Sequence, residues 1–190
     1  YNIFKRNLKI ENRKVNTKYF LDSFKLISKS ERPLLVIGYG VRVSKTEKIL
    51  RDIIKKNNFK YVTTWTAADL FKTNARNNLG IIGMSGQKGA NKAVFDSDLI
   101  LCLGTHLSIP HTTTLYESYA QKSKKIIVNI DNKQLKNLNI KFDLKINSEL
   151  KDYFKFLKDY LETKKRSYYW SNKINYKKLN WYEGKETCKP

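Results

Sequence analysis

The feature that most constrains the fold is an apolar run that ends in a glycine turn and leads into an amphipathic stretch. Residues 34–37 are continuously apolar, which is typical of a strand buried on both faces of a parallel sheet. Gly38-Tyr39-Gly40 follows as a tight turn, and the segment 44–47 has the pattern of a helix capping box. Apolar residues then recur at helical spacing, at Ile49, Leu50, Ile53 and Ile54. With a β-prone stretch at 61–64, this order predicts a right-handed βαβ unit.

The rest of the chain repeats the alternation of helix and strand. A helix is expected from Asn16 to the break at Pro33, on the apolar positions Phe20, Leu21, Phe24 and Ile27. Another helix is expected at 90–95, and further strands at 99–103, 126–130 and 142–146. Ser148 is expected to cap a last helix, with an apolar stripe of Leu150, Tyr153, Phe154, Leu157 and Leu161. The sequence therefore predicts an α/β fold: a Rossmann-like, doubly wound parallel sheet with helices on both faces.

The length of 190 residues corresponds to one domain with short extensions. We interpret 17–165 as that domain, 1–16 as a linker from a missing N-terminal domain and 166–190 as a linker toward a missing C-terminal domain. Because residue 1 is tyrosine and Met84 is the only methionine, we interpret the sequence as a fragment.

No apolar run approaches the roughly 18–20 residues that a membrane span requires, so no membrane partner is expected. Cys102 and Cys188 are the only cysteines, and they form neither a disulfide framework nor a zinc spacing. A reducing cytoplasm is the predicted location.

Positive charge dominates the composition. There are 38 Lys+Arg residues against 17 Asp+Glu residues, which gives a formal net charge of +21. Dense positive charge attracts polyanions, yet the cations are dispersed and no block of five or six like charges occurs. A solvated, lysine-rich surface is therefore favoured over a nucleic-acid interface.

Two glycine-rich segments are candidates for a ligand site. After Gly38 and Gly40, Val43 stands where a dinucleotide-binding fingerprint has its third glycine, so a structural turn and a phosphate contact both stay open. The segment 80–91 exposes backbone N–H groups ahead of a helix, and can bind a phosphate or contact another domain.

Other polar residues give no convincing catalytic centre. Asp131 ends a strand, where it can accept from ribose hydroxyls or cap the following turn. His106 and His111 lack the spacing of metal ligands, and Asp96 with Asp98 marks a helix end and a strand entry.

Five segments carry a further signal by their content and order: 32–42 (RPLLVIGYGVR), 62–65 (VTTW), 80–91 (GIIGMSGQKGAN), 98–104 (DLILCLG) and 125–131 (KIIVNID). Together they make residues 32–131 resemble the central domain of the acetolactate synthase branch of thiamine-diphosphate enzymes. With its flanking helices, the resemblance covers 17–165. Trp170, Trp181 and residues 188–190 resemble the connector to the family's third domain.

The resemblance implies a non-catalytic role for this chain. The family holds Mg²⁺ and diphosphate with a Gly-Asp-Gly…Asn motif in its third domain and takes its activating glutamate from its first, and Gly-Asp-Gly does not occur here. The implied parent is a lyase or transferase acting on 2-keto acids, in which the missing domains supply thiamine diphosphate and Mg²⁺. The implied partners are those N- and C-terminal domains and further copies, as a homo-oligomer (dimer or tetramer).

Some members of the family bind FAD or ADP through this domain. The matching positions here are Gly38, Gly40, Gly83, Ser85, Gly86, Gln87, Asn91, Thr105 and Asp131. The family's arginine after Gly104 is replaced within Thr105–Ser108, a proline is replaced by Asn132, and a Gly-Asp pair by Ile146-Asn147. We therefore expect no tightly bound FAD and at most modest affinity for an adenine nucleotide.

Two alternatives belong to other classes. A free-standing NAD- or adenine-nucleotide-binding Rossmann-type enzyme is disfavoured by the missing third glycine and the isolated histidines. A nucleic-acid-binding domain fits the net charge, but the basic and aromatic residues do not interleave on a recognisable strand motif.

Overall fold

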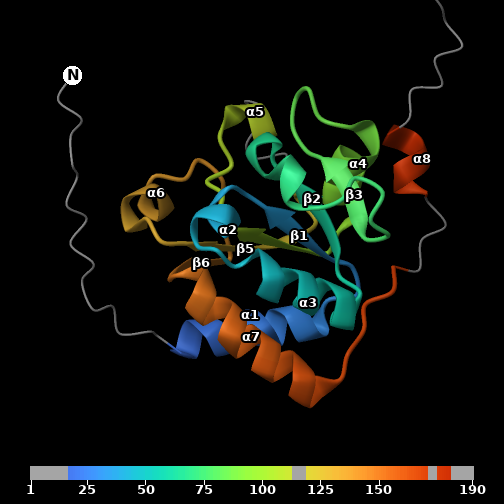
Figure 1. Cartoon of the computed structure of the whole chain (residues 1–190). Coiled ribbons are helices and arrows are strands. Elements are labelled where there is room, and N and C mark those ends of the chain that lie inside the picture. Colours follow the sequence, from blue (N-terminus) through green and yellow to red (C-terminus); the bar gives the residue numbers. More distant parts are fainter. Residues whose placement is uncertain (1–16, 113–118, 171–174, 181–190) are drawn as a thin grey trace, which may run out of the picture.

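The computed structural model describes residues 17–112, 119–170 and 175–180, and six strands in it form one parallel sheet (Figure 1). The strands are β1 (Pro33–Ile37), β2 (Lys60–Thr63), β3 (Asn78–Ile81), β4 (Leu99–Leu103), β5 (Lys124–Asn129) and β6 (Leu144–Asn147). Their spatial order is β3-β2-β1-β4-β5-β6, and each neighbouring pair is parallel. The chain reverses its direction of winding between β1 and β4, so the predicted doubly wound fold is confirmed.

Helices cover both faces of this sheet (Figure 1). The helices are α1 (Thr17–Lys29), α2 (Gly40–Val43), α3 (Glu47–Asn57), α4 (Lys88–Asp96), α5 (Ile109–Thr112), α6 (Asn132–Lys136), α7 (Leu150–Lys164) and α8 (Tyr176–Asn180). One apolar core joins the sheet to α1, α3 and α7, and a second joins it to α4, α6 and α8. A 3₁₀ helix, η1 (Trp65–Leu70), follows β2.

The central strands show why the apolar runs in the sequence are continuous. All five residues of β1 and of β4 are buried. Leu35 and Ile37 point into the first core, while Leu34 and Val36 point into the second. Because side chains alternate along a strand and both faces are covered, every position has to be apolar. The stripe predicted for the last helix is buried throughout α7.

Two local expectations were wrong, and one strand was not predicted. Ser44 does not cap a helix: it ends α2, and Thr46 precedes α3 without a side-chain capping bond. Ser148 does not cap α7, because Glu149 holds that position. Strand β3 was missed, because Gly80 interrupts its short apolar run with a φ of 115°.

The chain beyond α7 returns to the domain. Tyr168 is buried, stacks on Phe59 at a centroid distance of 4.6 Å and donates to the Ile27 carbonyl. Tyr176, in α8, is buried against α4 and β3. The proposed linker 1–16 lies outside the described residues, as do 171–174 and 181–190 of the proposed linker 166–190, with Cys188. Within those residues no helix is long and apolar enough to cross a membrane.

Candidate functional site at the carboxyl edge of the sheet

The predicted site residues lie in the loops and first helical turns that follow the strands, at the end of the sheet called here the carboxyl edge. Gly38 and Gly40 follow β1, residues 83–87 follow β3, Thr105 follows β4 and Asp131 follows β5. The common edge is a necessary result of a parallel sheet, and it is where Rossmann-type domains bind ligands. The strand order nevertheless separates the loops, because β2 lies between β1 and β3, and β4 lies between β1 and β5.

At the point where the strand order reverses, three glycines bring two backbones into contact. The Gly38 amide donates to the Leu103 carbonyl, and the Gly40 amide donates to the Gly104 carbonyl, both at 2.9 Å. A Cβ on Gly40 would lie 2.7 Å from the Gly104 Cα, and a Cβ on Gly38 would overlap the Gly104 carbonyl oxygen. Gly104 itself has a φ of +62°. The glycine turn therefore packs on the chain itself, and these two amides already have acceptors.

The glycine loop after β3 is held together by its own side chains. The Gly83 amide donates to Asn91 Oδ1 at 3.0 Å, and Asn91 Nδ2 donates back to the Gly83 carbonyl at 2.8 Å. Gln87 Oε1 accepts from the Ile81 amide at 2.9 Å. The Gly86 amide donates to the Gly83 carbonyl, while Ser85 is exposed. Gln87 and Asn91 thus shape the loop.

The segment after β4 reaches across to this loop. The Pro110 carbonyl accepts from the Met84 amide at 2.9 Å, and a Cβ on Gly83 would overlap that same carbonyl. Thr105 is buried, and its Oγ1 accepts from the Leu107 amide at 3.3 Å. Because β1 and β2 separate β4 from β3, residues 104–110 pass the ends of β1 and β2.

Asp131 is the N-cap of α6. One of its carboxylate oxygens accepts from the amides of Lys133 and Gln134, at 2.8 and 3.1 Å. Of the two roles left open for Asp131, the structure shows the cap. A contact with a ribose stays a prediction.

The histidines and the described cysteine do not assemble a reactive centre. His106 is exposed, and His111 Nδ1 lies 3.1 Å from Ser108 Oγ. Burial, and next the nearby His106, lowers the pKa of His111. Burial raises the pKa of the Cys102 thiol, which keeps it protonated. Within 17–112, 119–170 and 175–180, no group of three or more His, Cys, Asp or Glu residues could hold a metal ion.

A set of exposed apolar side chains was not predicted from the sequence. They lie at or just after the ends of four strands and are between 49% and 68% exposed: Tyr39, Val43, Trp65, Met84 and Ile130. We call them the apolar rim. Periodicity could not reveal it, because its members come from separate segments of the chain.

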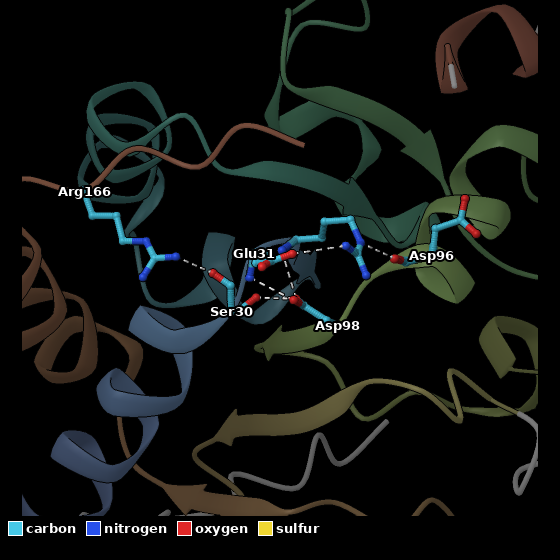
Figure 2. A network of polar contacts seen from close by, with 6 residues as sticks. Ser30, Glu31, Asp96, Asp98 and Arg166 are labelled. Atoms are coloured by element: carbon cyan, nitrogen blue, oxygen red, sulfur yellow. Dashed lines mark hydrogen bonds and ion pairs between the residues drawn. The ribbon is translucent and has the colours of Figure 1, made fainter. Parts of the chain in front are cut away.

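At the opposite, amino edge, side chains form a dense polar network (Figure 2). The Asp98 carboxylate accepts from the Ser30 hydroxyl and from the Glu31 and Arg32 amides, the last two at 2.8 and 3.0 Å. Burial alone raises the pKa of Asp98, but these hydrogen bonds and the Arg32 charge outweigh it, so the pKa lies below its usual range.

Two arginines extend this network (Figure 2). Arg32 Nε donates to the Asp96 carbonyl, and Arg166 Nη2 donates to the Ser30 carbonyl, both at 2.9 Å. Asp98 therefore has a structural role at the start of β4, in agreement with its interpretation as a strand entry.

The strand order and the glycine turn at its reversal define a Rossmann-type domain. Within that class, the chain belongs to the family described as thiamine pyrophosphate enzyme, central domain, which matches residues 22–157.

Two curated relatives illustrate the family's range. The chain is 29% identical over 137 residues to a 3D-(3,5/4)-trihydroxycyclohexane-1,2-dione hydrolase of Listeria monocytogenes, covering 72% of this chain and 21% of that protein. It is 32% identical over 120 residues to an acetolactate synthase of Mycobacterium bovis, covering 63% of this chain and 19% of that protein. The chain thus spans about a fifth of the length of these relatives.

Proposed function

We propose that this chain is the non-catalytic, structural central domain of a thiamine-diphosphate-dependent carboligase or decarboxylase of the acetolactate synthase type. In this proposal its carboxyl edge contacts the N- and C-terminal domains of the parent enzyme. Those domains bind thiamine diphosphate and Mg²⁺ and carry out the chemistry on a 2-keto acid. The parent is a cytoplasmic homo-oligomer.

The observation that carries this proposal is the state of the donors at the carboxyl edge. Phosphate-binding turns work by pointing free backbone N–H groups at the ligand. Here the amides of Gly40, Gly83 and Gly86 all donate within the chain, and Asp131 caps α6. The edge is therefore better suited to stable packing than to gripping a diphosphate.

The apolar rim supports contact with another domain at the same edge. Trp65 is 54% exposed and Met84 is 67% exposed, so both keep most of their area available for a partner. Large apolar side chains, and tryptophan above all, contribute most to protein interfaces when they become buried.

The docking role is tested with the double variant Trp65→Ala/Met84→Ala, in this chain and in a longer polypeptide that carries the flanking domains. In this chain the free energy of unfolding should change by less than about 1 kcal/mol, because both side chains are more than half exposed. In the longer polypeptide the interface should lose about 2 kcal/mol or more, with a fall in turnover.

The matched control is Phe95→Ala/Tyr169→Ala, which removes exposed aromatic side chains outside the apolar rim. It should be neutral in both proteins. Equal effects of the two double variants in the longer polypeptide would refute a docking role for the carboxyl edge.

A separate experiment tests the absence of catalysis. The purified chain, supplied with thiamine diphosphate, Mg²⁺ and pyruvate, should show no turnover, because no residue here matches the family's catalytic motifs. Mg²⁺-dependent decarboxylation by the chain alone would contradict the proposal.

Adenine-nucleotide binding is the second candidate, because the glycine loop lies directly ahead of the N-terminus of α4 at the carboxyl edge. The candidate ligand residues are Gly38, Gly40, Gly83, Ser85, Gly86, Gln87, Asn91, Thr105 and Asp131. Calorimetric titration with FAD and ADP, with an absorbance scan of the purified protein, tests it. We expect no bound flavin and at most modest ADP affinity, and a yellow protein would favour this candidate.

A further inference from the structure

A groove beside the edge strand β3 arises from an irregular crossover. In a doubly wound sheet, the connection from β2 to β3 normally carries a helix that lies beside α3 on the same face. Here that connection consists only of η1 and the segment 71–77. The place of a full helix is left partly open, and a cavity of about 700 Å³ lies between α3 and this connection. That volume falls in the usual range of small-molecule sites.

The floor of the groove is apolar and aromatic. Tyr61 and Phe71 lie with ring centroids 4.7 Å apart, next to Ile54 and Leu70, and all four side chains are buried in the first core. Arg51 is held above this floor: its Nη2 donates to the Leu70 carbonyl at 2.6 Å, and its guanidinium lies 5.6 Å from the Phe71 ring centroid. The four side chains of the floor are at most 8% exposed, so only a small part of each lines the groove and can contact an apolar or aromatic group.

The border of the groove, which is separate from the apolar rim, is strongly cationic. Arg51, Lys55, Lys72 and Arg76 line it, and Asp69 is the only carboxylate among its lining residues. Asp69 forms an ion pair with Arg42 at 2.5 Å, so its charge is already matched. The lining therefore carries uncompensated positive charge.

Two more lysines bring positive charge to the same segment. Lys60 Nζ donates to Asn77 Oδ1 at 3.1 Å, and Lys177 Nζ donates to the Ala75 carbonyl at 2.5 Å. Burial lowers the pKa of Lys60, and the charges of Arg76 and Lys177 lower it further. The cations thus repel one another around residues 72–77, and an anion bound there would relieve that repulsion.

We propose that the groove beside β3 binds a small phosphorylated organic molecule. Its phosphate group contacts Lys55, Lys72 and Arg76, and its apolar or aromatic body lies on Tyr61 and Phe71. A concave site with an apolar floor matches a compact ligand better than the extended backbone of a nucleic acid, which needs a continuous basic track. The groove lies on a face of the sheet, away from the glycine loop and Asp131, so this site is independent of the role proposed for the carboxyl edge.

The test is calorimetric titration of the full chain with ADP and with inorganic pyrophosphate at low salt. Both should bind, and ADP should bind more tightly by about tenfold, because the aromatic floor adds contacts that pyrophosphate cannot make. The variant Lys72→Glu/Arg76→Glu should weaken the binding of both ligands by at least about tenfold, since it reverses two exposed charges on the border of the groove.

The control variant Lys141→Glu/Lys145→Glu makes the same change in net charge just before and within β6, the outermost strand on the other side of the sheet. Both of its side chains are exposed. This control variant should leave ADP affinity within about twofold of the unchanged chain, because charges far from the groove act on ADP only through long-range electrostatics that salt screens. Circular dichroism of each variant confirms that the fold is retained.

Three results would overturn the proposal. They are no binding of either probe at millimolar concentration, equal losses of ADP affinity in the two variants, or ADP binding that Lys72→Glu/Arg76→Glu leaves unchanged. A single-stranded oligonucleotide that binds more tightly than ADP, and that both variants weaken alike, would assign the positive charge to nucleic acid instead.

Discussion

The two ends of the sheet are stabilised in different ways. At the amino edge, side chains hold the chain together: Asp98 accepts from Ser30 and from two backbone amides, while Arg166 connects the segment after α7 to the end of α1 (Figure 2). At the carboxyl edge, the main chain packs on the main chain at Gly38, Gly40 and Gly104, and the large side chains point outward.

This difference separates an edge of hydrogen-bonded side chains from an edge with exposed apolar side chains. At the amino edge, Ser30, Arg32 and Asp98 form hydrogen bonds within the chain. At the carboxyl edge, the glycine amides also form hydrogen bonds within the chain, but the side chains of the apolar rim are exposed. The four predictions below test this contrast, from the largest expected effect to the smallest.

The largest effect should come from adding a methyl group at the carboxyl edge. In Gly38→Ala the new Cβ overlaps the Gly104 carbonyl and the Thr105 Cβ, so the two loops must separate. We expect a loss of about 3 kcal/mol or more in the free energy of unfolding, measured with urea. The adjacent variant Tyr39→Ala removes a far larger but half-exposed side chain and should cost under about 1 kcal/mol. Similar losses for both would mean that the glycine contact does not hold the edge.

The second prediction makes the same substitution at both edges. Asp98→Asn removes the charge that binds two amides and a hydroxyl, and should cost about 1–3 kcal/mol. Asp131→Asn should change stability by only a few tenths of a kcal/mol, because asparagine caps a helix about as well as aspartate. The stability from Asp98 is present above the unfolded pKa of about 3.9 and is lost as the pH falls through the lowered folded value. Acid unfolding of the two variants measures this, and the reverse order of losses would contradict it.

The third prediction concerns the packing of α8 on α4 next to the amino edge. Tyr176 Oη donates to Asp96 Oδ2 at 2.9 Å, so Tyr176→Phe should cost about 1 kcal/mol and speed hydrogen exchange in α8. Tyr169→Phe, at an exposed position, should have no measurable effect. Unchanged exchange in Tyr176→Phe would show that this bond does not hold α8 in place.

The smallest effect should be a pH dependence at the carboxyl edge alone. Because burial and His106 lower the pKa of His111, the folded loop favours neutral His111; its stability is present above about pH 6.5 and is lost as the pH falls through the lowered value. Between about pH 7.5 and 5.5, the Met84 amide bound to Pro110 should lose exchange protection, and His111→Asn should abolish the change. The Arg32 amide should be unaffected, because Asp98 stays ionised over this range. Equal loss at Met84 and Arg32 would point to global weakening instead.

Most of the fold follows from the sequence, because parallel strands covered on both faces require continuous apolar runs. The runs at 34–37 and 99–103 therefore predict β1 and β4 well, and the stripe from Leu150 to Leu161 predicts α7. Strand β3 could not be predicted in this way, because no continuous apolar run marks it. It is an outermost strand of four residues with a glycine inside, and only its backbone pairing with β2 defines it.

The site is less predictable, because it depends on contacts between distant segments. The sequence places Gly83 and Asn91 in one glycine-rich loop, but not the paired hydrogen bonds by which Asn91 holds Gly83. The proximity of Gly40 to Gly104 requires the strand order, which no local pattern reveals. Exposure of Trp65 and Met84 also depends on how the loops pack, so the apolar rim becomes visible only in the structure.

The polar network at the amino edge has a consequence for folding kinetics. The Ser30–Asp98 contact joins residues 68 positions apart, and the Arg166–Ser30 contact joins residues 136 positions apart. Contacts of such long sequence separation close large loops, whose entropic cost favours late formation. If the network forms after the folding transition state, substitutions such as Asp98→Asn will accelerate unfolding while leaving the refolding rate nearly unchanged. The amino edge would then determine how long the domain stays folded, and the apolar strands would determine how fast it folds.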